Sequence, residues 1–390
     1  MEGDERDAGG RELNAAAASF TEDLVLEILS WLPAKALHRF KCVSRQWFGL
    51  ISNPDHRTKL DQTLAGFFYI GYTCGGPKDI PVKSLRFSSA RAGPGGPPPL
   101  IDPSVLSAPR FCENVHRVDC SNGLLLRCWK PGARNGFCYA VCNPATDEWA
   151  ALPDSPTCGA GCCTVRLAFD PAASPRVFRV FEFASGAGPR GRTTTVEIYS
   201  SETGAWTHRE CGWENGAGVT LRDESSSVFF DGMLRLAPIN PVIVAVDGDG
   251  KTWTSAPKPS DPDDDGFLGG PAPGFIAQSQ GRLHFLNTLE YDHMKLCVWE
   301  LDDSGVWAKK HSVNLRELFA GRWDYRVGLK YSVIGIHPDC NIVYFLQGEN
   351  HTLVSYAMAR GEGCVIRDLG YTNYVPYLPY VPLFSVSLAL

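Results

Sequence analysis

The first regular pattern of apolar and polar positions in the chain runs from Phe20 to Leu60. Its apolar residues recur every three or four positions, which is the spacing of a helix face and not of a strand. The first stripe comprises Leu24, Ile28, Leu29 and Leu32. Pro33 disfavours helical geometry at the residue before it, so one helix should end at Leu32 and a second should begin at Pro33. With a third stripe beginning near Ser44, the pattern predicts three short helices.

These three helices carry more large apolar side chains than about forty residues can bury among themselves. The surplus must be covered by the rest of the chain or by a partner. Apolar stripes at helical spacing are usually core, so an ordinary helical cap packed on a larger domain is one interpretation. An exposed docking face for another protein is the alternative.

After the helices, the pattern changes to short apolar runs separated by turn residues. From about residue 115 an apolar run, a small polar turn and a tryptophan recur as one unit. The four clearest copies end at Trp149, Trp206, Trp253 and Trp307. A fifth copy, residues 353–365, lacks the tryptophan, and turn signals such as Asp231-Gly232 precede several copies. Four short strands per unit at a period of about fifty residues are typical of propeller blades, with the tryptophans packed between them.

Strands are also predicted at the two ends of the repeat region, at residues 64–70, 84–87 and in the C-terminal tail. Pairing the two ends in one blade would protect the sheet edges that a propeller leaves where its ring closes. The tail prolines allow only an edge strand before Pro382, so residues 383–388 are the favoured strand. We therefore predict six blades, with five and seven as alternatives.

Composition excludes several classes of protein. The 390 residues carry a formal net charge of −6 without any run of lysine or arginine, which disfavours nucleic-acid binding. No apolar stretch is long enough to span a membrane. Residues 1–18 are acidic, lack the apolar centre of a signal peptide and are expected to be disordered. Without an export signal, the 14 cysteines should be reduced, in the cytoplasm, the nucleus or both.

The sequence offers weak candidates for metal, cofactor or catalytic chemistry. Cys158, Cys162 and Cys163 cluster without the paired spacing of a zinc site. Residues 246–252 resemble a phosphate-binding loop but lack its first glycine and a following helix. Residues 261–266 begin like a calcium loop without the glutamate that should follow. The histidines are scattered and no nucleophile elbow occurs. We therefore predict no catalytic residues, no metal and no cofactor.

The helical region resembles the F-box motif in its plant form. The resemblance is carried by residues 23–35, DLVLEILSWLPAK, by residues 39–44, RFKCVS, and by Trp47. The family usually opens with Leu-Pro, where this chain has Phe20 and Thr21. The resemblance implies docking on the S-phase-kinase-associated adaptor of a cullin ubiquitin ligase. The residues it assigns to adaptor binding are Phe20, Leu24, Ile28, Leu32, Pro33, Leu37, Val43 and Trp47.

The repeat region resembles the kelch-like, F-box-associated propeller of plant F-box proteins. The phrases Cys120-Ser-Asn-Gly-Leu124 and Asn143-Pro-Ala-Thr146 are similar to phrases of that family. The expected architecture is thus multidomain, α plus all-β, with a three-helix F-box at 19–60 and a kelch-like β-propeller at 64–390. The two resemblances together imply a non-enzymatic substrate-recognition subunit of an SKP–cullin–F-box ligase, whose propeller binds an unknown target protein. A non-ligase scaffold and a propeller that binds a ligand or glycan are the alternatives.

Overall fold

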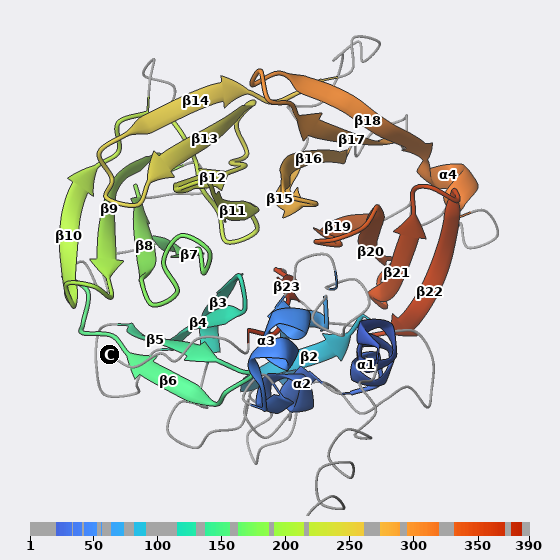
Figure 1. Cartoon of the computed structure of the whole chain (residues 1–390). Helices are drawn as coiled ribbons and strands as arrows, with labels where there is room; N and C mark the ends of the chain where they lie inside the picture. Colours follow the sequence, from blue (N-terminus) through green and yellow to red (C-terminus); the bar gives the residue numbers. More distant parts are fainter. Residues whose placement is uncertain are drawn as a thin grey trace, which may run out of the picture. The chain divides into compact units, whose positions relative to one another are not determined.

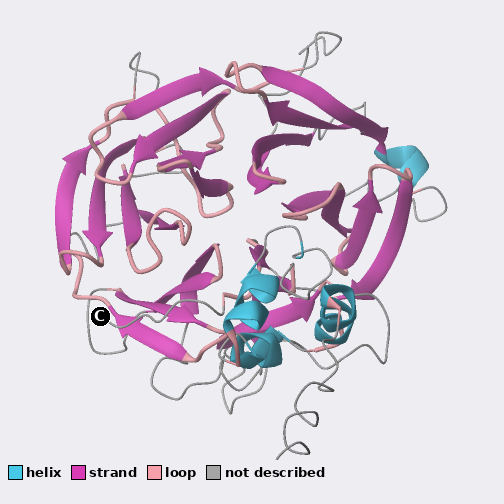
Figure 2. Ribbon diagram, viewed as in Figure 1, coloured by secondary structure: helices cyan, strands magenta, loops and turns pink. Residues whose placement is uncertain are grey.

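A computed structural model of the chain describes residues 21–32, 34–40, 43–52, 56, 64–73, 82–90, 115–129, 137–156, 163–186, 191–213, 218–260, 274–288, 295–319, 331–370 and 376–383. The chain divides into two compact units, residues 1–62 and residues 63–390. The first is helical, and the second is built of strands with one short described helix, α4 (Leu315–Leu318) (Figures 1 and 2). The segment predicted to be disordered, residues 1–18, lies outside the described residues.

The helical unit contains α1 (Glu22–Ser30), α2 (Ala34–Phe40) and α3 (Arg45–Ser52). Thr21 occupies the N-cap position of α1, but its side chain makes no capping hydrogen bond. α3 has a side-chain cap, since the Ser44 hydroxyl oxygen accepts a hydrogen bond from the Trp47 N–H at 3.1 Å. α1 ends two residues earlier than the sequence predicts. The N–H groups of Trp31 and Leu32 bond to carbonyls three residues back, which tightens the last turn.

The second unit contains five four-stranded antiparallel sheets, and in each the strands follow one another along the chain. The first two are β3 (Val115–Ser121), β4 (Leu124–Trp129), β5 (Cys138–Asn143), β6 (Glu148–Ala151), and β7 (Cys163–Phe169), β8 (Phe178–Ser185), β9 (Thr193–Ser200), β10 (Ala205–Glu210). The third is β11 (Ser227–Phe230), β12 (Met233–Leu236), β13 (Val242–Asp247), β14 (Trp253–Pro257). The last two are β15 (Gly274–Ser279), β16 (Arg282–Thr288), β17 (Lys295–Leu301), β18 (Trp307–Asn314), and β19 (Tyr331–Ile336), β20 (Ile342–Gln347), β21 (Thr352–Ala357), β22 (Glu362–Asp368).

A sixth sheet joins the two ends of this unit. It has the order β2-β1-β23, where β1 is Gly66–Thr73, β2 is Val82–Ser89 and β23 is Leu378–Tyr380. Figure 1 shows the six sheets around a common axis, with β3, β7, β11, β15, β19 and β23 innermost. The predicted six-bladed propeller is therefore confirmed, and so is the blade shared by the N- and C-terminal strands.

The tail strand differs from the prediction. The ladder with β1 is formed by β23, whose Pro379 lies opposite Phe67, and not by a strand beginning at Leu383. Leu383 is described outside any strand, and residues 384–388 lie outside the described residues. The prolines are tolerated because β23 is the edge strand of its sheet and needs hydrogen bonds on one side only.

The tail continues from β23 onto the neighbouring β3–β6 blade. The side-chain amide of Asn143 donates a hydrogen bond to the Leu383 carbonyl at 2.9 Å, and Leu383 packs on the apolar cluster of that blade. Gly123 lies directly beneath the tail, with φ of 90°. A Cβ added to Gly123 would lie 2.5 Å from Leu383 Cβ and 2.8 Å from the Val381 oxygen. One residue of each family-like phrase, Gly123 and Asn143, thus lies against the segment that follows β23.

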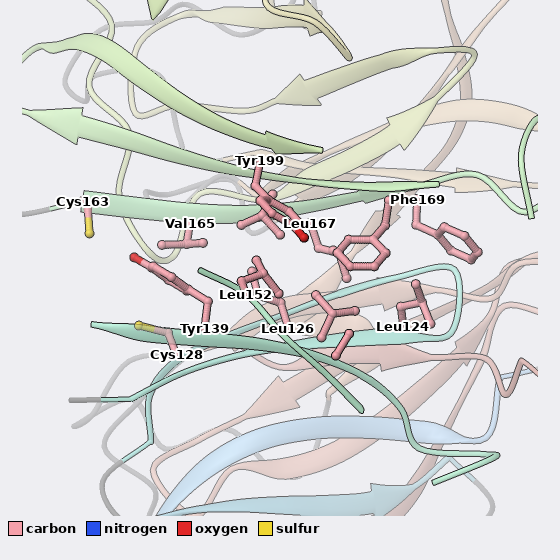
Figure 3. Close-up of a cluster of buried hydrophobic side chains, with 14 residues drawn as sticks. Leu124, Leu126, Cys128, Tyr139, Leu152, Cys163, Val165, Leu167, Phe169 and Tyr199 are labelled. Carbon is pink, nitrogen blue, oxygen red and sulfur yellow. The ribbon is translucent and has the colours of Figure 1, made fainter. Parts of the chain in front are cut away.

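Apolar side chains fill the space between neighbouring blades. Figure 3 shows one such cluster, in which Leu126 and Tyr139 face Val165 and Leu167 of the next blade. The repeat tryptophans are partly buried against these clusters, as Trp206 is here. The other three occupy equivalent positions, namely Trp149, Trp253 and Trp307. The tryptophans therefore pack between blades, as the repeat predicts.

Polar side chains on or next to the inner strands bond to the backbone on or next to the following inner strand. Asp119 accepts a hydrogen bond from the Leu167 N–H at 2.6 Å, Ser226 accepts one from the Ile276 N–H at 2.8 Å, and the Ser279 hydroxyl donates one to the His337 carbonyl at 2.6 Å. Burial raises the pKa of Asp119 to about 6, against the opposing effect of Arg166 and of its backbone hydrogen bonds. These contacts fix the distance between inner strands, and the sequence pattern did not reveal them.

Candidate functional site

Helix α1 carries apolar side chains on two faces. Val25, Leu26 and Leu29 are buried in the core that α1 forms with α2 and α3, and Leu29 has no exposed surface. Leu24 and Ile28 point away from that core, with 50% and 49% of their surface exposed. The sequence placed Leu29 in one stripe with Leu24 and Ile28, and this prediction is wrong because Leu29 faces the core. In a unit this small, only one of the two apolar sides of α1 is buried.

The structure places the predicted adaptor-binding residues in three environments. Leu24, Ile28 and Val43 are exposed. Leu32 and Trp47 are partly buried and pack against the helical core, and Leu37 is fully within it. Phe20 and Pro33 lie outside the described residues. Adaptor binding by these residues stays a prediction, with the exposed ones able to reach a partner directly.

The partly buried residues hold the exposed ones in place. The rings of Phe40 and Trp47 lie 5.2 Å apart between α2 and α3. Leu37 joins Leu50 and Ile51 in the same core. A change at Leu37 or Trp47 should therefore act on a partner by disturbing the helices, whereas a change at an exposed residue acts on the contact itself.

The sequence prediction did not include two exposed aromatic residues of this unit, Trp31 and Phe48. They are 81% and 55% exposed. Helical spacing alone could have indicated Trp31, because it follows Leu24 and Ile28 by seven and three positions. Large apolar side chains that are exposed among the described residues are Leu24, Ile28, Trp31, Val43, Phe48 and Val306. Five of these six residues, all but Val306, belong to the helical unit. We call these five residues the exposed apolar set.

Two shallow hollows on the described part of the propeller were the best candidates for a ligand site. One, of about 280 Å³, lies between the β7–β10 and β11–β14 blades and is lined by Asp170, Arg179 and Asp249, with no histidine, cysteine or lysine. The other, of about 340 Å³, lies beside Arg192 and Cys211. Burial raises the pKa of Cys211 to about 12, so its thiol is protonated at neutral pH. Neither lining contains a histidine or a lysine.

The loop that resembles a phosphate-binding site is the turn between β13 and β14. One carboxylate oxygen of Asp247 accepts hydrogen bonds from the N–H groups of Asp249 and Lys251, at 3.1 and 2.8 Å, and the other accepts one from Thr252 at 2.9 Å. The N–H groups that would have to bind a phosphate therefore already donate to Asp247. The pattern is therefore explained by turn geometry.

Within the described ranges, no group of three or more histidine, cysteine, aspartate or glutamate side chains is placed to hold a metal ion. No described helix is long and apolar enough to cross a membrane. Cys163 of the cysteine cluster is a buried thiol whose pKa is raised to about 12, chiefly by burial. Cys158, Cys162 and the calcium-like run 261–266 lie outside the described residues.

Comparison with known proteins agrees with this architecture. Residues 19–59 match the F-box domain, and residues 103–373 match the family described as F-box protein At3g26010-like, beta-propeller. F-box protein At5g07610 of Arabidopsis thaliana is 27% identical over 335 residues, which cover 81% of this chain and 75% of that protein. F-box protein At5g49610 of the same plant is 26% identical over 348 residues, which cover 84% and 85%.

Among solved structures, a protein from Lactobacillus plantarum aligns with a TM-score of 0.42 at 12% identity, covering 79% of this chain and 82% of that one. This likeness is too weak to support an inference. The F-box and the six-bladed propeller together define the class of protein, an F-box protein with a propeller domain. The chain belongs to the family of F-box proteins with an At3g26010-like β-propeller.

Proposed function

We propose that this chain is the substrate-recognition subunit of an SKP–cullin–F-box ubiquitin ligase. Its family, with an F-box joined to a propeller, supports a substrate-receptor role in general. In this proposal the F-box docks on the S-phase-kinase-associated adaptor and, through it, on a cullin. The propeller recruits a target protein, and the ligase transfers ubiquitin to lysines of that target. The chain itself performs no catalytic step.

The observation that carries the proposal is the exposed apolar set of the helical unit. Five of the six exposed large apolar side chains lie on this short helical segment. The far larger described part of the propeller has only Val306. Leaving apolar surface in water costs about 25 cal/mol per Å² relative to burying it. Exposed apolar patches of this kind on soluble proteins mark interaction sites. A partner that covers the set removes that cost, and the F-box family supplies one in the adaptor.

Joining the two binding units in one chain gives the proposed mechanism. A target held by the propeller is kept at high effective concentration relative to the ligase that the F-box recruits, so no new contact is needed to favour ubiquitin transfer. We further propose that this takes place in the cytoplasm, the nucleus or both. The described cysteines are free thiols, which suits those reducing compartments.

The adaptor contact is tested by a charge at Ile28. Ile28→Asp places a carboxylate in the apolar interface, where an unpaired charge costs several kcal/mol. The full chain is co-expressed with the adaptor, and the complex is measured by co-precipitation and size-exclusion chromatography. We expect the wild-type chain to co-elute with the adaptor and Ile28→Asp to elute alone.

Val306→Asp is the matched control, since Val306 is similarly exposed but lies on the propeller. We expect this variant to co-elute with the adaptor as the wild-type chain does. Ile28 is half exposed, so its replacement should leave the thermal melt of the chain nearly unchanged. Adaptor binding that persists in Ile28→Asp, with both variants folded, would show that the apolar face is not the docking surface.

A further inference from the structure

Trp31 is the most exposed large apolar side chain among the described residues. It is the C-cap residue of α1, with 81% of its surface exposed. Its backbone still has helical geometry, with φ −89° and ψ −6°, and its N–H bonds to the Ile28 carbonyl at 3.2 Å. The side chain of Trp31 therefore continues the face of α1 beyond the end of the helix.

The direction of that face follows from helix geometry. Successive residues advance by about 100° around the axis, so Leu24, Ile28 and Trp31 fall within an arc of about 60°. The buried residues Val25 and Leu29 lie outside this arc, on the side of α1 that faces the core. We call the three exposed residues the outer face of α1. Trp31 adds the largest side chain to a face whose other two members are predicted, from the F-box resemblance, to bind the adaptor.

We propose that Trp31 is a principal anchor of the adaptor interface; this inference rests on the proposed function. The occupant is the adaptor because Trp31 is continuous with Leu24 and Ile28 on the outer face, so a protein that covers those two residues must also meet Trp31. The F-box pattern leaves position 31 unspecified, which makes this contact particular to the present chain and not a property of the motif.

The chemistry of tryptophan defines the surface that would receive it. An indole buries a large apolar area while losing few rotamers, and tryptophan is enriched among residues that dominate protein–protein affinity. Its ring should enter an apolar depression on the adaptor. The indole N–H, which has no hydrogen-bond partner among the described residues, should meet an acceptor at the edge of that depression.

Charge and polarity on α1 agree with this orientation. Asp23 and Glu27 are exposed on α1 and lie outside the buried core. The helix therefore turns its buried residues inward, keeps its carboxylates in water and leaves the outer face apolar. A helix that only capped this small unit would need one apolar face, and an exposed second apolar face is typical of an interaction surface.

The inference is tested by titrating the purified adaptor into the full chain and measuring Kd and the dissociation rate. We expect Trp31→Ala to weaken binding at least tenfold, mainly through faster dissociation. Trp31→Phe keeps an aromatic ring and should lose less than Trp31→Ala. Val306→Ala, a truncation of an exposed apolar residue on the propeller, is the control and should bind as the wild-type chain does.

The outcomes separate this inference from the proposed function. If the wild-type chain binds and Ile28→Asp does not, but Trp31→Ala stays within twofold of wild type, the adaptor does not use Trp31 and the inference is wrong. If the wild-type chain fails to bind, the proposed function fails first and the inference with it. Sedimentation tests a second copy of the chain as the occupant. A wild-type dimer that Trp31→Ala dissociates, with adaptor affinity unchanged, also overturns the inference.

Discussion

The closure of the ring can be tested by replacing Gly123 with alanine. Gly123 ends the two-residue turn between β3 and β4, and Gly232 ends the equivalent turn between β11 and β12. Both have positive φ, of 90° and 70°, so both resist a side chain. They differ in their surroundings. The Cβ of an alanine at 123 would overlap the tail at Leu383 and Val381, whereas at 232 it would meet nothing within 4 Å.

The expected loss of stability has two parts, a backbone cost that applies to both glycines and a clash with the tail that applies only to Gly123. A left-handed backbone costs an alanine about 1–2 kcal/mol, and this applies to both positions. At Gly123 the clashes are with Leu383 Cβ and the Val381 oxygen, atoms that cannot move without the backbone. Displacing the tail loses the hydrogen bond from Asn143, worth about 1 kcal/mol, and the packing of Leu383, worth about 1–2 kcal/mol. We expect losses of about 3–5 kcal/mol for Gly123→Ala and about 1–2 kcal/mol for Gly232→Ala.

Thermal melting of the full chain, followed by tryptophan fluorescence or calorimetry, measures this difference. For a domain of this size, 2–3 kcal/mol corresponds to roughly 3–4 °C in Tm between the two variants. Gly281→Ala is a second control, because Gly281 also has positive φ and open space around it. Equal Tm values for the three alanine variants would show that the tail does not press on the β3–β4 turn in solution.

Three further predictions concern the propeller. Deleting residues 380–390 removes the end of β23 and the tail, and should lower the propeller Tm by many degrees; an unchanged melt would mean that the ring closes without them. A fragment that starts at Leu64 should express as a soluble, folded propeller, since each blade buries its face on its neighbours, and aggregation would count against the boundary. Asp119→Asn should flatten the dependence of stability on pH. The pKa of Asp119 is raised from 3.8 to about 6, so the stability that this group contributes is full below pH 3.8 and is lost as the pH rises through 6. The wild-type chain should lose up to about 3 kcal/mol over that range relative to Asp119→Asn, and parallel pH profiles would contradict this.

The repetitive parts of the fold could be predicted because the same local pattern recurs. A turn followed by a tryptophan, such as Trp149 or Trp206, recurs in four of the blades, and a signal repeated at a regular period outweighs the ambiguity of any single strand. The shared blade was predictable from the physical need to cover open sheet edges. The strand at Leu378–Tyr380 was not, because a proline in a strand is acceptable only on an edge, and the sequence does not say which strand will be one.

The candidate site was only partly predictable. Helical spacing identified the apolar residues of α1, but the choice of buried face depends on how α2 and α3 pack, so Leu29 and Ile28 were assigned to one stripe.

In the propeller, the contacts of Asp119 and Asn143 were also missed. Each bonds to the backbone of a segment far away in sequence, Leu167 or Leu383, and no local pattern encodes such a partner.

The most direct test of the account is to compare what the chain captures in cells with and without its adaptor contact. The full chain and its Ile28→Asp variant are affinity-captured with and without an inhibitor of cullin ligases, and the recovered proteins are quantified. We predict that both forms bind the same target protein. The target should accumulate with the wild-type chain only when the inhibitor is present. It should accumulate with Ile28→Asp in either condition. Recovery of the same proteins in the same amounts in all four samples would contradict the assignment of this chain as a ligase substrate receptor.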